Sequence, residues 1–360
     1  MIFYSLVVLF SFSLSFSIVL LEKNFFKVED VNLRARQASH IRPTLRLGGI
    51  AILISSMVSY LVQKGFSGWE LFVTALPIFF IGLLEDIGFK NPPKIRLLVA
   101  VLCSAVTIYL YGAWLSNIDT FGVDWLLSFP IAGIFFTIFA MAGLINAINL
   151  IDGLNGLACG QVMISAVSIS ILATSVGESN ISTLALVIGF ATFGFFLINY
   201  PFGYLFLGDA GAYTLGFLLA WMLVGLSHRH PNLSDWSLLC LVIWPVSDTF
   251  LAIIRRKFMS LSPGSPDRLH FHQVIMRACQ ILTRGRISKK IANPLASSII
   301  LPLIALPALG GVLYSHDPKV SFLIAISAVI VFSGSYFYII RIIKNASKRR
   351  MIIAFLCSYI

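Results

Sequence analysis

The sequence predicts an all-α protein, a bundle of membrane-spanning helices that forms a single domain over residues 1–360. Composition is the first observation: 58% of the residues are hydrophobic, 11% are charged and the mean hydropathy is +0.92, whereas about a quarter of the residues in a soluble domain are charged. The second is that apolar runs long enough to cross a bilayer recur along the whole chain. No linker-like or low-complexity stretch divides them, so we expect one domain.

Residues 2–21 form the first expected span. No basic residue precedes them, and six Lys/Arg residues follow within 22–46, so we expect an uncleaved span with an outside N-terminus rather than a secretory signal. Further spans are expected at 47–63, 70–84, 95–112, 125–146, 157–175, 181–198, 211–227, 236–254, 293–314 and 320–342. Eleven spans that start outside place the C-terminus in the cytoplasm.

The distribution of basic residues supports this topology. The segments expected inside are 22–46, 85–96, 255–290 and 341–350, and they hold 23 of the 26 Lys/Arg residues, as the positive-inside rule requires. The net charge of +11 is therefore explained by the membrane, and we expect no nucleic-acid partner. The five cysteines show no CxxC or CxxH spacing, so neither disulfides nor a zinc site is expected.

The stretch from 146 to 160, NAINLIDGLNGLACG, interrupts the apolar sequence with polar residues. Asn146, Asn149, Asp152 and Asn155 recur every third residue, so in helical form they would share one face. Polar groups between two spans must reach an interface or a cavity, which makes this stretch a candidate site. The alternative interpretation is an Asn/Gly-rich turn, which would not need this spacing.

Two further motifs place carboxylates next to expected inner ends of spans. In GLLEDIGFKNPPKIR, residues 82–96, Glu85 and Asp86 follow a span; the alternative is a solvated helix end. In NYPFGYLFLGDAGAYTLG, residues 199–216, Asp209 lies between glycines before a span. Glycine lets backbone approach an anion or a metal, whereas the simpler interpretation makes Asp209 a helix N-cap.

The longest inner loop is basic and contains the pattern HxH at His270 and His272. Such a patch would bind phosphates, although the positive-inside rule also explains its Lys/Arg residues and a lone HxH is a weak metal signal. Asp248, just upstream, is expected to pair with Arg255 or Arg256. The carboxylates and the basic residues together predict a cytoplasm-facing pocket suited to Mg²⁺ and phosphates, beside an apolar groove for a lipid tail.

Five motifs resemble, in order, those of the polyprenyl-phosphate N-acetylhexosamine-1-phosphate transferases, a family that includes GlcNAc-1-phosphate transferases and the phospho-MurNAc-pentapeptide translocases. They are RPTLRLGG, GLLEDIGFKNPPKIR, NAINLIDGLNGLACG, NYPFGYLFLGDAGAYTLG and PDRLHFHQ. The resemblance implies that undecaprenyl phosphate attacks the β-phosphate of a UDP-N-acetylhexosamine and releases UMP. It also implies a bacterial cytoplasmic (inner) membrane location and an Mg²⁺ cofactor, with Mn²⁺ as a substitute.

The resemblance implies a role for each motif residue. Asp209 would be the principal metal ligand and Asp152 a second one. Catalytic roles are implied for Asp86, which would activate or position the lipid phosphate, for Asp152, and for His270, which would contact the diphosphate. Substrate contacts are implied for Asn149, Asn199, Lys94, Arg96, Arg46, Asp267, Arg268, His272, Glu85 and Asn155. Whether transfer takes one step or two stays open.

The motifs depart from the family pattern at three positions: Glu85 and Asn155 stand where Asp is usual, and Gln273 where His is usual. UDP-GlcNAc is the first donor expected, for O-antigen or another surface polysaccharide, and UDP-QuiNAc, UDP-FucNAc and UDP-MurNAc-pentapeptide remain open. A secondary transporter or lipid flippase is the alternative of a different class, but it predicts charges near the membrane midplane. A homodimer is left open.

Overall fold

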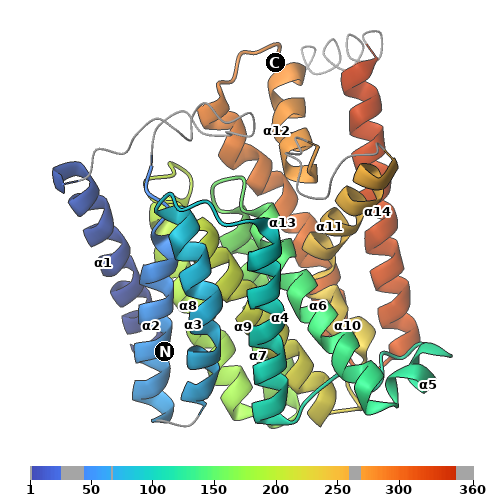
Figure 1. The fold of residues 1–360 in the computed structure, drawn as a ribbon. Coiled ribbons are helices and arrows are strands. Elements are labelled where there is room, and N and C mark those ends of the chain that lie inside the picture. Colours follow the sequence, from blue (N-terminus) through green and yellow to red (C-terminus); the bar gives the residue numbers. More distant parts are fainter. Residues whose placement is uncertain (1, 26–43, 66–67, 259–268, 346–360) are drawn as a thin grey trace.

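The computed structural model describes residues 2–25, 44–65, 68–258 and 269–345, and every regular element in them is an α-helix (Figure 1). This confirms the predicted all-α class. The helices are α1 (Ile2–Phe25), α2 (Gly48–Lys64), α3 (Trp69–Asp86), α4 (Pro93–Tyr111), α5 (Val123–Leu127), α6 (Pro130–Ile151), α7 (Leu157–Ser175), α8 (Ser179–Asn199), α9 (Gly208–Arg229), α10 (Asp235–Cys240), α11 (Ile243–Phe258), α12 (Phe271–Leu282), α13 (Lys289–Leu313) and α14 (Pro318–Lys344).

Each expected span coincides with one helix or with two successive helices. Among the described residues, eight helices are long and apolar enough to cross a membrane, and α2 is a shorter apolar helix. The span expected at 125–146 begins instead at Pro130, because proline favours the first turn of a helix and α5 ends just before it. The total of eleven spans and their sidedness stay predictions.

The span expected at 236–254 is broken between α10 and α11. Pro245 has no N–H to donate to the carbonyl four residues earlier, which belongs to Leu241. That carbonyl instead accepts hydrogen bonds from Gln161 Nε2 (3.0 Å) and Ser165 Oγ (2.7 Å) of α7. A break inside a membrane needs such partners, because lipid offers none.

Helix α9 forms the centre of the bundle and is buried along almost its whole length. Helices α2, α3, α6 and α7 pack around it, while α1 packs on α8 and α2 at one edge and α14 lies at the other (Figure 1). The ends of α3 and α6, the start of α9 and all of α12 lie at the upper end in Figure 1. The polar motifs, far apart in the sequence, therefore meet at one end of the bundle, as the charge pattern predicts.

Candidate active site

The motif-bearing end of the bundle is built around the N-terminus of α9. The turn before α9 pairs with the segment before α2: the Phe206 N–H donates to the Leu45 carbonyl (2.9 Å), and the Gly48 N–H donates to the Phe206 carbonyl (2.9 Å). These bonds hold Arg46 beside Gly208. Because Gly208 has a φ of +78° and a Cβ there would meet the Arg46 carbonyl oxygen, this close approach requires glycine.

The carboxylate of Asp86, at the end of α3, caps α9. Its two oxygens accept hydrogen bonds from the backbone N–H groups of Asp209 and Ala210, each at 2.9 Å. The first N–H groups of a helix lack partners within it, and a carboxylate there also meets the positive end of the helix dipole. Asp86 therefore holds Asp209 in place, a contact that differs from the lipid-phosphate contact implied by the family resemblance.

Asp209 is the point at which side chains from several helices converge. Its Oδ1 accepts from Asn149 Nδ2 of α6 at 3.0 Å, and its Oδ2 accepts from Arg96 Nη1 of α4 at 3.4 Å. The same Arg96 nitrogen lies 3.8 Å from Glu85 Oε1 of α3. Four of the residues singled out from the sequence thus form one connected cluster.

The carboxylates near the start of α9 repel one another. Burial, followed by the charge of Asp209, raises the pKa of Asp86 to about 8. Burial also raises the pKa of Asp152 to about 7; Arg46 acts against this rise and Asp209 adds to it. Both groups lie just beyond the apolar part of their helices. A cation bound between them would favour their ionised forms.

This donor set fits a magnesium ion. Mg²⁺ is usually held by one or two carboxylates together with substrate phosphates rather than by a complete protein cage. Asp209 and Asp152 supply carboxylates, and Asn149 places an amide on Asp209. No group of three or more His, Cys, Asp or Glu residues in the described parts of the chain is arranged to hold a metal alone. Substrate oxygens would therefore have to complete the coordination.

The polar residues from 146 to 155 do not share one continuous helical face, contrary to the expectation from their spacing. Helix α6 ends at Ile151, so Asp152 caps it and Asn155 lies in the following turn. Asn146 donates to its own helix, at the Ala142 carbonyl (2.8 Å). The glycines after Asp152 end the helix before a fourth polar residue can join the face.

Asn155 and Asn199 tie two loops together. The Asn155 side chain donates to the Pro201 carbonyl (2.8 Å), and the Asn199 Oδ1 accepts from the Gly156 N–H (2.6 Å). Asn199 Nδ2 also donates to the Leu205 carbonyl at 2.8 Å. The amide of Asn199 is thus used within the protein, whereas the buried Asn155 Oδ1 has no hydrogen-bond partner among the described residues.

His270 and His272 are both buried at the start of α12. Each has its Nδ1 near Asp248 Oδ2, at 3.2 Å for His270 and 3.9 Å for His272. Asp248 thus pairs with the HxH pattern, while its expected pairing with Arg255 or Arg256 stays a prediction. Burial lowers the pKa of His272 to about 4, so this ring is neutral at pH 7. Its Nε2 packs against Gly153, where a Cβ would meet it.

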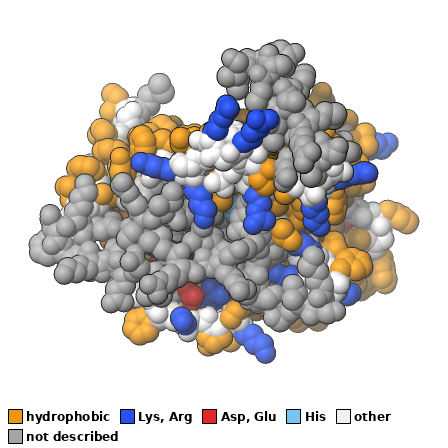
Figure 2. All heavy atoms as spheres, turned by 90° about the horizontal axis from the view of Figure 1, so that it is seen from above, with side chains coloured by type: hydrophobic (Ala, Val, Ile, Leu, Met, Phe, Trp, Pro, Cys, Tyr) orange, Lys and Arg blue, Asp and Glu red, His pale blue; other side chains and the backbone are white. Residues whose placement is uncertain are grey.

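Of the remaining predicted residues, two are exposed on the surface and two fall outside the residues that the structure describes. Lys94 and Arg46 are exposed, whereas Asp267 and Arg268 fall outside the described residues. Figure 2 shows Lys and Arg side chains gathered on the end of the molecule seen from above. A surface of this charge attracts anionic phosphate groups.

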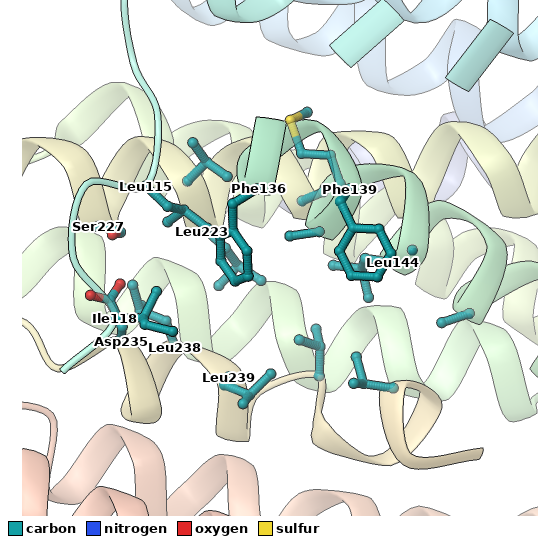
Figure 3. Close-up of a pocket in the computed structure, with 18 of the residues that line it drawn as sticks. Leu115, Ile118, Phe136, Phe139, Leu144, Leu223, Ser227, Asp235, Leu238 and Leu239 are labelled. Atoms are coloured by element: carbon teal, nitrogen blue, oxygen red, sulfur yellow. The ribbon is translucent and has the colours of Figure 1, made fainter. Parts of the chain in front are cut away.

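An apolar cavity of about 390 Å³ lies between α6, α9, α10 and α11 (Figure 3). Phe139 of α6 and Phe250 of α11 line it and are also exposed at the surface of the bundle, so it opens to the surroundings. Ala147 lines its wall two residues before Asn149 of the polar cluster. The cavity and the polar site are thus built on the same helix.

Comparison with known proteins gives consistent matches. The sequence model "Glycosyl transferase family 4" matches residues 69–227. A Bacillus subtilis (strain 168) protein named "Probable undecaprenyl-phosphate N-acetylglucosaminyl 1-phosphate transferase" is 29% identical over 69% of this chain and 70% of its own length. Proteins named "Undecaprenyl-phosphate alpha-N-acetylglucosaminyl 1-phosphate transferase" are 29% identical in Escherichia coli O157:H7, over 61% of both chains, and 27% identical in Yersinia pestis, over 76% of both. These matches support the resemblance of the chain to the polyprenyl-phosphate N-acetylhexosamine-1-phosphate transferases.

Some residues that shape the site of this transferase carry little signal in the sequence. Asn293 of α13 accepts the Asn155 N–H at 2.8 Å, and Tyr336 of α14 donates to the Leu269 carbonyl at 2.9 Å. Asn293 and Tyr336 lie in helices whose sequences predict only apolar membrane spans. Asp248 carried a stronger signal, since a carboxylate inside an apolar run needs a partner, but the sequence did not indicate which one.

Proposed function

We propose that this transferase moves N-acetylhexosamine-1-phosphate from a UDP-sugar to undecaprenyl phosphate, giving undecaprenyl-diphospho-sugar and UMP. We further propose that it works in the cytoplasmic (inner) membrane of a bacterium with its site facing the cytoplasm. The names of the relatives, the basic surface around the site and the concentration of Lys/Arg in the segments expected inside support this assignment.

One observation carries the proposal: Asp86, Asp152 and Asp209 come from three motifs and meet at the N-terminus of α9, next to Arg96. Carboxylates suit a divalent cation, and a helix N-terminus with an arginine suits phosphate oxygens. A site for a diphosphate and its cation needs this combination. The carboxylates lie at helix ends rather than at mid-helix, which favours an enzyme over a transporter.

The acceptor is proposed to lie with its polyprenyl chain in the apolar cavity and its phosphate toward Arg96 and Glu85. The cavity presents almost only hydrocarbon and opens at Phe139 and Phe250, which suits an apolar chain entering from the membrane. Arg96 bridges Asp209 and Glu85 at 3.4 and 3.8 Å. This places a positive charge between the two carboxylates, so two anionic substrates can approach each other.

The chemistry follows from charge neutralisation. Mg²⁺, or Mn²⁺ in its place, would stabilise the negative charge that develops on the diphosphate. Asp209 and Asp152 would hold the cation, with Asn149 fixing the orientation of the Asp209 carboxylate through its 3.0 Å hydrogen bond. Asp86 would keep Asp209 at the helix N-terminus, and His270 would contact the diphosphate. An oxygen of undecaprenyl phosphate would form a bond to the β-phosphorus, the bond between the β-phosphorus and the bridging oxygen would break, and UMP would leave with that oxygen.

UDP-GlcNAc is the proposed donor, because the relatives are named for N-acetylglucosaminyl transfer. The pathway proposed is O-antigen or another surface polysaccharide. UDP-QuiNAc, UDP-FucNAc and UDP-MurNAc-pentapeptide are the competing donors.

The test is UMP release by purified protein with undecaprenyl phosphate, Mg²⁺ and each of the four donors. Release is expected with UDP-GlcNAc, and Asp209→Asn is expected to abolish it because the variant loses the carboxylate that would hold the cation. Glu178→Gln is the matched control: Glu178 pairs with Arg229 (3.2 Å) at the opposite end of the bundle, and an exposed pair contributes about 0–1 kcal/mol. No UMP with any donor would refute the proposal.

A further inference from the structure

The carboxylate of Asp248 lies in the interior between α11 and α12 with both oxygens engaged. Asp248 is 1% exposed. Its Oδ1 accepts the Phe271 N–H at 3.2 Å, and its Oδ2 lies 3.2 Å from His270 Nδ1. A buried carboxylate is tolerated only when its oxygens are hydrogen-bonded. Both of these hydrogen bonds lead to the start of α12.

This geometry determines which ring nitrogen of His270 is available. A carboxylate oxygen is only an acceptor, so the Nδ1 of His270 must carry the proton that it donates. The Nε2, on the other side of the ring, is then the atom left to contact a substrate. Carboxylates behind functional histidines commonly act in this way, by setting the tautomer and the ring orientation.

A second contact holds the same segment from α14. The Tyr336 hydroxyl donates to the Leu269 carbonyl at 2.9 Å and accepts from Arg255 Nη1 at 2.8 Å. Arg255 also lies over the Tyr336 ring, 5.8 Å from its centroid. The backbone on both sides of His270 is therefore held by hydrogen bonds, and its ring is held by Asp248 Oδ2.

His272 does not compete for this role. Its Nδ1 is 3.9 Å from Asp248, beyond hydrogen-bond distance, and has no hydrogen-bond partner among the described residues. Its Nε2 faces Gly153. The two histidine rings are stacked with their centroids 5.8 Å apart and nearly parallel. Asp248 is therefore the hydrogen-bond partner of His270, and His272 is its stacking neighbour.

We infer that Asp248 is a positioning residue for the transfer reaction: it orients His270 so that Nε2 faces the diphosphate. This inference rests on the proposed function for the identity of the substrate, but the orientation itself does not. Asp248 also supports the first N–H of α12, so its test must separate an effect on the ring from an effect on the helix.

The test combines kinetics with a direct measurement on the ring. Asp248→Asn is expected to lower kcat for UMP release about 10- to 100-fold, the range for partners that orient functional histidines, and His270→Gln at least as much. If Asp248 acts through His270, the double variant is no slower than His270→Gln alone. Asp248→Glu is expected to recover part of the rate. Additive losses in the double variant would overturn the inference.

The ring is measured in protein carrying ¹⁵N-labelled histidine, with His270→Gln identifying the signal among the six histidines. The wild type is expected to show a protonated, hydrogen-bonded Nδ1 at His270, and Asp248→Asn to lose it. Ser247→Ala is the matched control, because the Ser247 hydroxyl donates to its own helix, at the Ile243 carbonyl. An unprotonated Nδ1 in the wild type would overturn the inference whatever the activity. Absence of UMP release with a protonated Nδ1 would instead refute the proposed function.

Discussion

Substituting alanine for Gly153 tests how tightly the Asp152 turn packs on α12. Gly153 has an ordinary backbone conformation, so alanine is allowed there. The added Cβ would meet His272 Nε2, and it would lie 3.0 Å from Cδ2 of the same ring. That ring is 2% exposed and cannot move into solvent. Overpacking of this kind costs about 1–3 kcal/mol of unfolding free energy.

The assay is thermal unfolding of the purified protein in detergent, where this cost corresponds to a fall in Tm of about a few degrees. His272→Ala removes the ring, so Gly153→Ala should cost nothing further in that background. Gly334→Ala is the control, since Gly334 is an exposed glycine of α14 and a Cβ there would meet nothing within 4 Å. A wild-type Tm for Gly153→Ala, or an equal cost with and without His272, would refute the packing described here.

Two further substitutions test the helix N-terminus and the cavity. Gly208→Ala would need a positive φ, which costs about 1–2 kcal/mol, and would press on the Arg46 carbonyl; we expect lower Tm and loss of UMP release, and normal activity would contradict the assigned role of this turn. Gly143→Leu fills open space in the cavity wall, so it should raise KM for undecaprenyl phosphate about tenfold by displacing about two buried methylenes. The KM for the UDP-sugar should stay unchanged, and an equal rise in both would contradict the acceptor site.

The helices could be predicted closely because hydropathy is a property of each segment. The span expected at 157–175 is α7 to the residue, and the one at 181–198 lies within α8. That the motifs lie at one end of the bundle was also predictable, since the Lys/Arg counts of several loops together indicate which loops share a side of the membrane. Even the break before α11 left a signal, Pro245, although its partners Gln161 and Ser165 came from another helix.

The contacts within the site could not be predicted in this way. Sequence spacing suggested that Asn155 joins a polar face, but α6 ends at Ile151 and Asn155 instead binds two loops. Helix α12 was not expected, because a short amphipathic helix beside basic residues resembles a loop. In the folded protein its apolar face packs on α13 and α14, and the sequence does not indicate these partners.

Composition and motifs were enough to predict a bundle of membrane helices with the motif carboxylates and most of the basic residues at one end, because insertion into lipid depends on the composition of each segment. The contacts themselves became known from the folded structure: Asp86 with the backbone of Asp209, and Asp248 with His270. Those pairs join helices that are distant in the chain. A hydrogen bond between them exists only after packing has fixed which helices are neighbours and at what height.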